Sequence, residues 1–401
     1  MLSDDVEFNK AVLDRIRLKC QSLLQADDFL KQCIGRSYAQ FLAHSSHRSK
    51  INLVLVEIVS FTSLIFFLGF QIIRRVGLKT TLQIQCSGVR LVHRSRYEVN
   101  PEIYQIPEEL SEMDIVTGFY NLSYLRICDA IIVFRALRSS FSLGCLWNFQ
   151  FAFKIAKDLG TLRPIFDTYD PEFILVYREY DCSLSMITNI CRGQGVSVFN
   201  VMHGDKYFNT LDSFFLVDRC YCWHSYYVDL FRRQHVSCQN FRIFENAALR
   251  RKSDFEGVKL EQVGIVMPAY YTLGSSPHSD ATSMSQFISC VNKLSEDYSV
   301  VLRPHPLHPD HYDPFKHHLL PSIKISAGID EDSIDFVGSK KVVVGAYSTV
   351  LLESALMGRN TIVIDTDRLA GIKGHHFIFE YPNVAVVSME DLEHAVRESM
   401  G

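Results

Sequence analysis

Two apolar segments that each end abruptly in polar residues constrain the fold of this chain more than any other feature. The first, residues 299–306, reads Ser-Val-Val-Leu-Arg-Pro-His-Pro. Proline cannot continue a strand ladder, so the pattern predicts a buried parallel strand with Arg303, His305 and Pro306 at its carboxyl end. Because ligands of open α/β sheets bind outside the carboxyl ends of the strands, these residues are predicted to line a ligand site.

The second segment, residues 340–358, reads as a strand, a turn of small residues and a helix. Lys-Lys-Val-Val-Val-Gly-Ala precedes Tyr347, and the helical run that follows ends at Gly358. Ser348 or Thr349 is therefore predicted as the helix N-cap. The N–H groups at a helix N-terminus, together with these hydroxyls, favour an anion. The two segments together predict a place for a nucleotide monophosphate or diphosphate.

The length and charge of the chain limit the kind of protein it can be. With 401 residues, 47% of them hydrophobic, the chain can bury two cores of ordinary size. Its net charge of -4 argues against a nucleic-acid partner, because such proteins normally show a clustered basic surface. Two domains and no nucleic-acid binding are therefore predicted.

The cysteines and histidines predict neither a disulfide framework nor a metal site. The cysteines show no pairing pattern, and the chain opens with acidic residues in place of a secretory signal. Cys220 and Cys222 have no second pair nearby, and prolines interrupt the histidine-rich segment over residues 305–318. We therefore expect reduced thiols in a cytoplasmic protein, and no metal.

The first 48 residues are predicted to form a helical extension. Apolar residues recur there near helical spacing, at Val6, Val12, Leu13, Ile16, Leu18, Leu23 and Leu24. Such a pattern favours an amphipathic segment that packs on the main body or on a partner.

Residues 51–73 form a long apolar run that permits two interpretations. Its length suggests a membrane-spanning helix. Asn52, Glu57 and Gln71 interrupt it. We favour a buried strand over residues 53–58, a helix capped by Ser60 or Thr62, and a strand over residues 80–85, as the opening of a Rossmann-like domain. The same run also allows peripheral contact with the cytoplasmic face of an inner membrane.

Between residues 88 and 168 the pattern is weaker. It predicts helices over residues 122–137 and 147–159, and a loop-rich segment between Val92 and Met113. No residue of this region is assigned a role.

Two further predicted strands deliver candidate catalytic residues. The first, over residues 171–181, ends with Glu179 and Asp181, and the second, over residues 196–202, is followed by His203. Adjacent parallel strands end at the same sheet edge, so a carboxylate and an imidazole there can supply a general base. The alternative is structural: Glu179 pairs with a surface cation and His203 caps a loop.

A charged stretch over residues 250–259 is predicted as the linker between two domains. The division is then a helical extension over residues 1–48, a Rossmann-like domain over residues 49–255 and a second one over residues 256–401. Residues 270–285, rich in Ser, Gly and Thr, follow the first strand of the second domain and are predicted to face the cleft. The predicted fold class is α/β, with two Rossmann-like domains facing a central cleft.

The ordered set of motifs resembles a known group of enzymes. The motifs are, in order, His203-Gly204, Arg303-Pro304-His305-Pro306, and Ser348-Thr349 with Glu353. On two Rossmann-like halves they resemble glycosyltransferases of the GT-B architecture, above all bacterial surface-polysaccharide enzymes that use cytidine nucleotides. Polysialyltransferases and other CMP-sialic acid or CMP-Kdo transferases carry a His-Pro motif and a downstream Ser/Thr motif. Teichoic-acid polymerases that use CDP-glycerol or CDP-ribitol carry His-Gly, Arg-x-His-Pro and Ser-Ser-x-x-x-Glu/Asp segments.

The resemblance, which covers residues 171–365, implies a role for each matching residue. It makes His305 the ligand of the donor phosphate, with Arg303 beside it. Ser348 and Thr349 would hold the same phosphate through hydroxyl and backbone N–H groups, and Glu353 would accept the ribose hydroxyls. Further substrate contacts are expected from Gly204, Lys206 and Tyr347. These groups could stabilise the charge that grows on departing CMP without a metal.

The expected activity is transfer of a sialic-acid-like (nonulosonic acid) or Kdo sugar from a CMP-sugar to a glycan or glycolipid acceptor. Such a transfer would serve bacterial capsule, lipopolysaccharide or other surface-polysaccharide synthesis. The nucleotide sugar is a substrate, and no separate cofactor is expected. The alternatives are a CDP-glycerol or CDP-ribitol phosphotransferase, a UDP-sugar 2-epimerase-like enzyme and a non-catalytic sugar-binding protein.

Overall fold

A computed structural model shows two compact units, each built on its own parallel sheet. It describes residues 6–45, 56–68, 91–94, 107–111, 115–118, 125–143, 148–177, 179–202, 204–258, 260–267, 277–304, 316–326, 331–366, 369, 372 and 376–401. Residues 7–203 and 209–244 form the N-terminal unit, and residues 204–208 and 245–401 form the body of the C-terminal unit. The segment 204–208 therefore packs with the C-terminal unit, although the chain on both sides of it belongs to the N-terminal unit.

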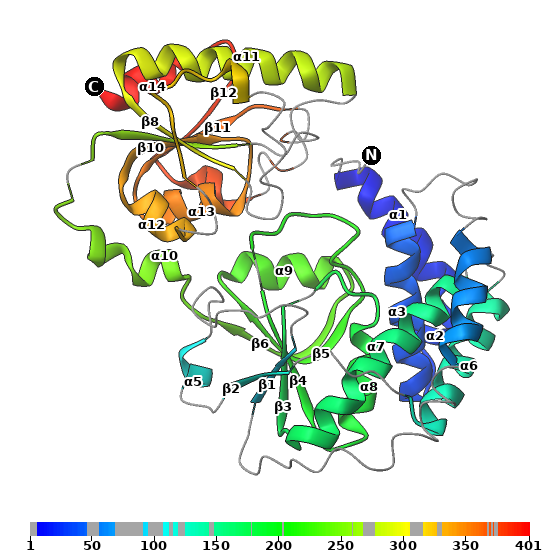
Figure 1. The fold of residues 1–401 in the computed structure, drawn as a ribbon. Helices are drawn as coiled ribbons and strands as arrows, with labels where there is room; N and C mark the ends of the chain where they lie inside the picture. Colours follow the sequence, from blue (N-terminus) through cyan, green and yellow to red (C-terminus); the bar gives the residue numbers. More distant parts are fainter. Residues whose placement is uncertain are drawn as a thin grey trace. The chain divides into compact units, whose positions relative to one another are not determined.

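The C-terminal unit is a six-stranded sheet in the order β12-β11-β10-β7-β8-β9, with every pair parallel. The strands are β7 (Gln262–Val266), β8 (Ser299–Arg303), β9 (Lys324–Ile325), β10 (Lys340–Gly345), β11 (Asn360–Ile364) and β12 (Val384–Val387). One face carries α11 (Pro277–Asp297) and α14 (Leu392–Met400), and the other carries α12 (Ser333–Gly338) and α13 (Thr349–Leu356) (Figure 1). Three short helices complete the unit: α10 (Ala247–Arg250), η1 (Lys252–Phe255) and η5 (Phe377–Glu380).

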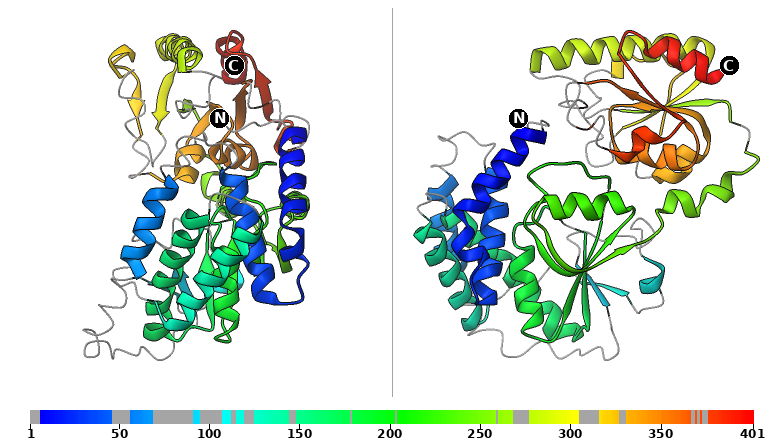
Figure 2. Two further views of the ribbon diagram at one scale, coloured as in Figure 1. Left: turned by 90° about the vertical axis from the view of Figure 1, so that its right-hand side faces the viewer. Right: turned by 180° about the vertical axis from the view of Figure 1, so that it is seen from behind.

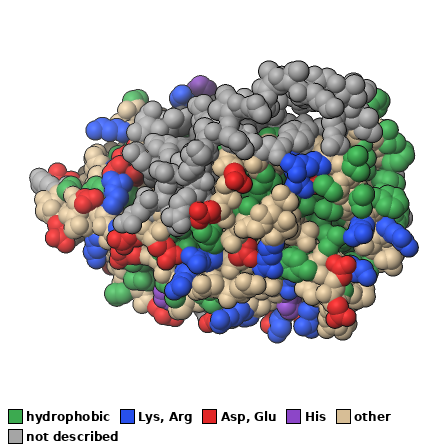
Figure 3. Space-filling view, turned by 90° about the horizontal axis from the view of Figure 1, so that it is seen from below, with side chains coloured by type: hydrophobic (Ala, Val, Ile, Leu, Met, Phe, Trp, Pro, Cys, Tyr) green, Lys and Arg blue, Asp and Glu red, His purple; other side chains and the backbone are tan. Residues whose placement is uncertain are grey.

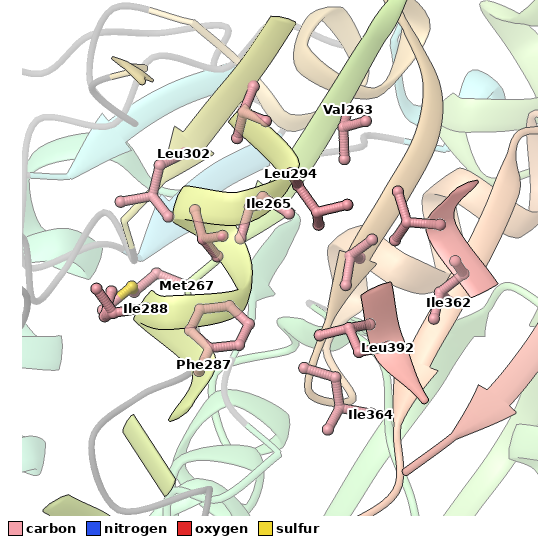
Figure 4. Close-up of a cluster of buried hydrophobic side chains, with 14 of the residues drawn as sticks. Val263, Ile265, Met267, Phe287, Ile288, Leu294, Leu302, Ile362, Ile364 and Leu392 are labelled. Atoms are coloured by element: carbon pink, nitrogen blue, oxygen red, sulfur yellow. The ribbon is translucent and has the colours of Figure 1, made fainter. Parts of the chain in front are cut away.

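Aliphatic side chains from the strands and from α11 and α14 form the core of this unit (Figure 4). Val263 and Ile265 of β7 meet Leu302 of β8, while Phe287 and Leu294 approach from α11. Strands buried on both faces need near-continuous apolar runs, which explains why Val342, Val343 and Val344 are all completely buried in β10.

The N-terminal unit is a second six-stranded parallel sheet, in the order β2-β1-β3-β4-β5-β6. The strands are β1 (Leu91–Arg94), β2 (Ile115–Gly118), β3 (Phe173–Val176), β4 (Ser197–Val201), β5 (Leu216–Cys222) and β6 (Ser237–Ile243). Besides a helix over residues 56–68, the described helices of this unit are α1 (Val6–Lys19), α2 (Gln21–Leu24), α3 (Phe29–Ser45), α5 (Glu108–Ser111), α6 (Ile127–Ser142), α7 (Asn148–Tyr169), α8 (Leu184–Arg192) and α9 (Ser225–Arg233). Both views in Figure 2 show α1, α2, α3, α6 and α7 bundled beside the sheet.

The predicted α/β class with two Rossmann-like units is confirmed by these two sheets. The units differ from the predicted domain bounds in two places. The helices before residue 48 belong to the N-terminal unit, and the chain crosses to the C-terminal unit at Phe244 and Glu245, ahead of the charged stretch over residues 250–259.

For the run over residues 51–73, the predicted strand is wrong where it can be compared, whereas the predicted helix is present as far as residue 68 but begins before Ser60 and Thr62. Residues 56–68 are helical, so no strand extends to residue 58. The buried side chains recur at Glu57, Ser60 and Leu64, which is helical spacing. Glu57 is buried because its carboxylate accepts the backbone N–H groups of Phe149 and Gln150 at the start of α7. The predicted strand over residues 80–85 lies outside the described residues.

In two other regions the predicted elements can be compared with the structure. The helices predicted over residues 122–137 and 147–159 are confirmed as α6 and α7, although α7 continues to Tyr169. The segment predicted as loop-rich includes all but the first residue of β1 and the whole of α5. Residues 277–285, predicted to face the cleft, form the first part of α11. Within the described part of the chain, no helix combines the length and apolar character needed to cross a membrane.

Candidate functional site

Ser348 lies at the junction of β10 and α13, where the sequence predicts a helix N-cap. The structure confirms that position: Ser348 has extended backbone angles (φ -161°, ψ 165°), and α13 begins at the next residue. Its side chain nevertheless makes no capping hydrogen bond. The buried Oγ finds no hydrogen-bond partner among the described residues. The fold therefore places a hydroxyl at the start of the helix without using it.

Thr349, the first residue of α13, holds the segment 204–208. Its Oγ1 accepts a hydrogen bond from the backbone N–H of Asp205 at 2.9 Å. Gly204, just before, has a φ of 71°, in the left-handed region. A Cβ at Gly204 would lie 3.1 Å from Thr349 Oγ1, which is a tight contact. Glycine is therefore required both by the backbone angle and by the close approach to α13.

Gly204→Ala is expected to lower the free energy of unfolding by about 1–2 kcal/mol. Alanine is sterically strained at this backbone angle, and its methyl group would be in tight contact with the hydroxyl of Thr349. Urea denaturation measures the loss. Gly195→Ala is the matched control, because it has a similar φ of 76° but nothing within 4 Å of the added Cβ. Equal losses in the two variants would contradict the role assigned to the Thr349 contact.

Asp205 is the centre of a buried hydrogen-bond cluster. Its Oδ1 accepts from the backbone N–H of Lys206 at 2.7 Å and lies 2.9 Å from Nε2 of His376, and its Oδ2 accepts the hydroxyl of Tyr347. His376 Nδ1 accepts the backbone N–H of Ile378 at 3.2 Å. The imidazole therefore carries its proton on Nε2 and donates it to Asp205. We call Asp205, Tyr347 and His376 the Asp205 cluster.

This cluster assigns a structural task to the predicted substrate contacts. The hydroxyl of Tyr347 is bonded to Asp205 and lies 3.0 Å from His376 Nε2. Gly204 and Lys206 lie in the segment that the cluster fixes to the C-terminal unit. His376 does not appear in the sequence-based site, because nothing in its local pattern distinguishes it. Only its contact with Asp205, 171 positions away, reveals it.

Glu353, in the middle of α13, is a buried carboxyl group. Only 3% of the residue is exposed, and Oε2 finds no hydrogen-bond partner among the described residues. The pKa of Glu353 is raised to about 7, chiefly by burial and also by the charge of Asp332, against the opposing effects of a hydrogen bond from Ser333 and the charge of Arg303. A buried oxygen without a partner among the described residues is suited to a hydrogen-bonding ligand.

Arg303 ends β8, as predicted, but it is not a surface residue. Its guanidinium donates to the backbone oxygen of Glu331 at 2.8 Å and lies 5.2 Å from the ring centroid of Phe336. Burial lowers the pKa of Arg303, while the carboxylates of Glu331 and Glu353 oppose the shift. The guanidinium of Arg303 also lies 3.8 Å from the carboxylate of Glu331, which is partly exposed. Arg303 is a buried cation close enough to Glu353 for each charge to affect the pKa of the other.

The candidate bases of the N-terminal unit are buried and accept hydrogen bonds within that unit. Glu179 is completely buried, and its Oε1 accepts from Asn200 Nδ2 at 3.3 Å, so Glu179 does not lie on the surface as the structural alternative supposed. Asp181 Oδ1 accepts the backbone N–H and the hydroxyl of Ser183 at 3.1 and 2.7 Å, and Lys154 Nζ lies 3.5 Å away. These contacts hold Asp181 in place. A base role for either residue stays a prediction.

Three of the predicted site residues lie outside the described residues: His203, His305 and Pro306. Of the others, the structure gathers Gly204, Lys206, Arg303, Tyr347, Ser348, Thr349 and Glu353 in the C-terminal unit. The described residues include no group of three or more His, Cys, Asp or Glu placed to hold a metal ion. The described site thus offers a helix N-terminus, an unused hydroxyl, a buried cation and a buried carboxyl group.

Comparison with known proteins gives structural neighbours of low identity. No protein-family model and no curated sequence matches the chain. The UDP-GlcNAc 2-epimerase of Methanocaldococcus jannaschii has 12% identity, a TM-score of 0.48, and coverage of 78% of this chain and 92% of its own. The E. coli ADP-heptose lipopolysaccharide heptosyltransferase II has 8% identity and a TM-score of 0.35, and the match covers 78% of this chain and 98% of its own. The wall teichoic acid polymerase TagF has 10% identity and a TM-score of 0.39, and the match covers 88% of this chain and 90% of its own. At these identities the functions of the neighbours do not transfer to this chain.

Proposed function

We propose that this protein is a glycosyltransferase that transfers a nonulosonic acid or Kdo sugar from a CMP-sugar to a glycan or glycolipid acceptor. The donor nucleotide would bind at the carboxyl ends of β8 and β10. Its phosphate would lie at the N-terminus of α13 against Ser348, and its ribose hydroxyls would reach Glu353. The acceptor would be a precursor of a bacterial surface polysaccharide, processed at the cytoplasmic face of the inner membrane.

The observation that carries the proposal is the pair of unused buried oxygens on α13. Ser348 Oγ and Glu353 Oε2 are both buried without a partner among the described residues. A buried polar group without a hydrogen bond costs about 1–3 kcal/mol, so such groups are retained where a ligand completes them. A hydroxyl and free N–H groups suit a phosphate, and a carboxyl group suits a ribose diol.

The charge arrangement supports cleavage of a phosphate–sugar bond. As the sugar departs, negative charge grows on the phosphate of CMP. The N-terminus of α13 and the buried cation of Arg303 are fixed before the reaction begins, so they could stabilise that charge without reorganisation. Burial lowers the pKa of Arg303, and the carboxylates of Glu331 and Glu353 beside it favour the charged guanidinium.

A panel of nucleotides in a thermal-shift assay tests the proposal. CMP and a CMP-sugar are expected to raise the Tm, because a ligand of the native state alone stabilises it by about 2.7 kcal/mol at a hundred times its Kd. Ser348→Ala is expected to leave the Tm of the free protein unchanged, since its hydroxyl has no partner in the described structure. The same variant is expected to reduce the shift produced by CMP.

Ser388→Ala is the matched control. Ser388 lies just before α14 and its hydroxyl bonds Asp391 at 2.7 Å, so this variant is expected to lower the Tm and to keep the full CMP shift. Stabilisation by UDP compounds with no response to cytidine nucleotides would overturn the donor assignment, and formation of an epimer from UDP-N-acetylhexosamine would identify an epimerase. A CDP-glycerol or CDP-ribitol preference would point to phosphotransfer.

A further inference from the structure

Two helices of the N-terminal unit expose an unusual number of large apolar side chains. They are the helix over residues 56–68 and α6. We call the following exposed residues the apolar face: Ile58, Val59, Phe61, Ile65, Phe66, Ile127, Ile131, Phe134 and Phe141. Exposure reaches 77% at Phe66 and 70% at Ile127. Contiguous apolar surface of this kind marks a site of interaction with a protein or a membrane.

The two helices present one continuous surface. Phe149, at the start of α7, contacts both of them: its ring centroid lies 4.8 Å from that of Phe61 and 5.7 Å from that of Phe141. On α6 the exposed residues follow the spacing i, i+4, i+7 and i+14, so they form one stripe along the helix. Figure 3 shows hydrophobic side chains gathered at the side of the molecule where Figure 1 draws these helices, with both basic and acidic side chains nearby.

The exposed charged side chains of these two helices are all basic among the described residues. Arg135 and Arg138 of α6 are exposed. The two carboxylates of these helices, Glu57 and Asp129, are buried and hydrogen-bonded within the fold. Glu57 accepts two backbone N–H groups of α7, and Asp129 forms hydrogen bonds to Arg163. Among the described residues of the two helices, therefore, the exposed charges are positive and no carboxylate is exposed.

We propose that the apolar face docks on a membrane surface that contains anionic lipid headgroups. Apolar side chains would enter the boundary between headgroups and acyl chains, while Arg135 and Arg138 would pair with lipid phosphates. A protein partner would need acidic groups around an apolar patch, whereas an anionic bilayer supplies both features over any area. The sequence draws attention to the run over residues 51–73, but the tertiary structure adds α6 and gives the surface its charge.

Vesicle sedimentation with the full chain tests the proposal. Wild-type protein is expected to bind phosphatidylcholine vesicles that contain phosphatidylglycerol, and to bind less as salt increases. The double variant Ile131→Ser with Phe134→Ser is expected to bind at least about tenfold more weakly. Both side chains are exposed in the free protein, so their apolar area is buried only when the protein is bound to the membrane. The variant Arg135→Glu with Arg138→Glu is expected to lose a similar factor on these vesicles.

Matched controls use other exposed residues of the same unit. Ile243→Ser removes an apolar side chain that is 61% exposed on β6, and Arg232→Glu with Arg233→Glu reverses two exposed charges on α9. Both controls should bind as the wild type does. The proposal would be overturned if the protein did not bind the vesicles, or if the controls lost as much binding as the test variants. It would also be overturned if sedimentation velocity showed a dimer that Ile131→Ser dissociates, because the apolar face would then bind a second copy of the chain. No nucleotide enters the assay, so its failure is distinct from failure of the donor assignment.

Discussion

Glu353→Gln is expected to raise the free energy of unfolding by about 3 kcal/mol at about pH 8, while weakening nucleotide binding. Burial raises the pKa of Glu353 from 4.5 to about 7 in the folded chain. The folded state therefore holds the proton more tightly than the unfolded state does, and stability falls as pH rises from about 4.5 to 7. Glutamine does not ionise, so the variant escapes this loss. Urea denaturation at several pH values measures the difference.

The pH dependence separates this effect from a general gain in packing. Below about pH 4.5 the carboxyl group is protonated in both states, so the wild type and Glu353→Gln should have similar stabilities. Glu398→Gln is the control, since its carboxylate is an exposed partner of His394 and should show no such difference. A variant no more stable than the wild type at about pH 8 would contradict the account of Glu353 as a strained buried carboxyl group.

The same variant tests the role of Glu353 in binding. A carboxylate that accepts a ribose hydroxyl contributes about 1.5–3 kcal/mol, so its loss should weaken CMP binding by about tenfold or more. Isothermal titration calorimetry at about pH 8 gives the Kd. Higher stability combined with weaker binding is the pattern expected of a group kept for a ligand at the expense of the fold. Higher stability with unchanged binding would show that Glu353 does not contact the nucleotide.

Asp205→Ala is expected to lower the free energy of unfolding by about 3 kcal/mol. The change removes the carboxylate that accepts from the hydroxyl of Tyr347, the Nε2–H of His376 and the backbone N–H of Lys206, and a buried hydrogen bond lost in this way costs about 1–3 kcal/mol. Thermal and urea unfolding followed by circular dichroism measure the loss. Hydrogen exchange should show that protection falls first in the segment 204–208 and at the start of α13.

Asp254→Ala is the control for Asp205. Asp254 belongs to the same unit and pairs with Arg251 at 3.5 Å on the surface, where removal of a carboxylate should change stability by no more than about 0.5 kcal/mol. Asp205→Asn keeps one acceptor oxygen and should cost less than alanine. If Asp205→Ala unfolds at the same urea concentration as the wild type, the Asp205 cluster does not anchor the segment.

Local sequence predicted the elements that frame the site. Three consecutive valines specify β10, and Gly358, with a φ of 75°, follows the last turn of α13 as a helix C-terminus requires. These signals placed Ser348 at the N-cap and Arg303 at the end of β8, where the structure has them. They also predicted parallel strands alternating with helices, which both sheets confirm.

The sequence by itself determined these backbone elements, because strand and helix preferences depend on neighbouring residues and on their periodicity. Only the tertiary structure decided which polar groups are used by the fold and which are left over. Glu57 became the acceptor at the start of α7, His376 became the partner of Asp205, and the hydroxyl of Ser348 stayed without a partner among the described residues. The physical reason is that burial and hydrogen-bond pairing depend on groups brought together from distant parts of the chain.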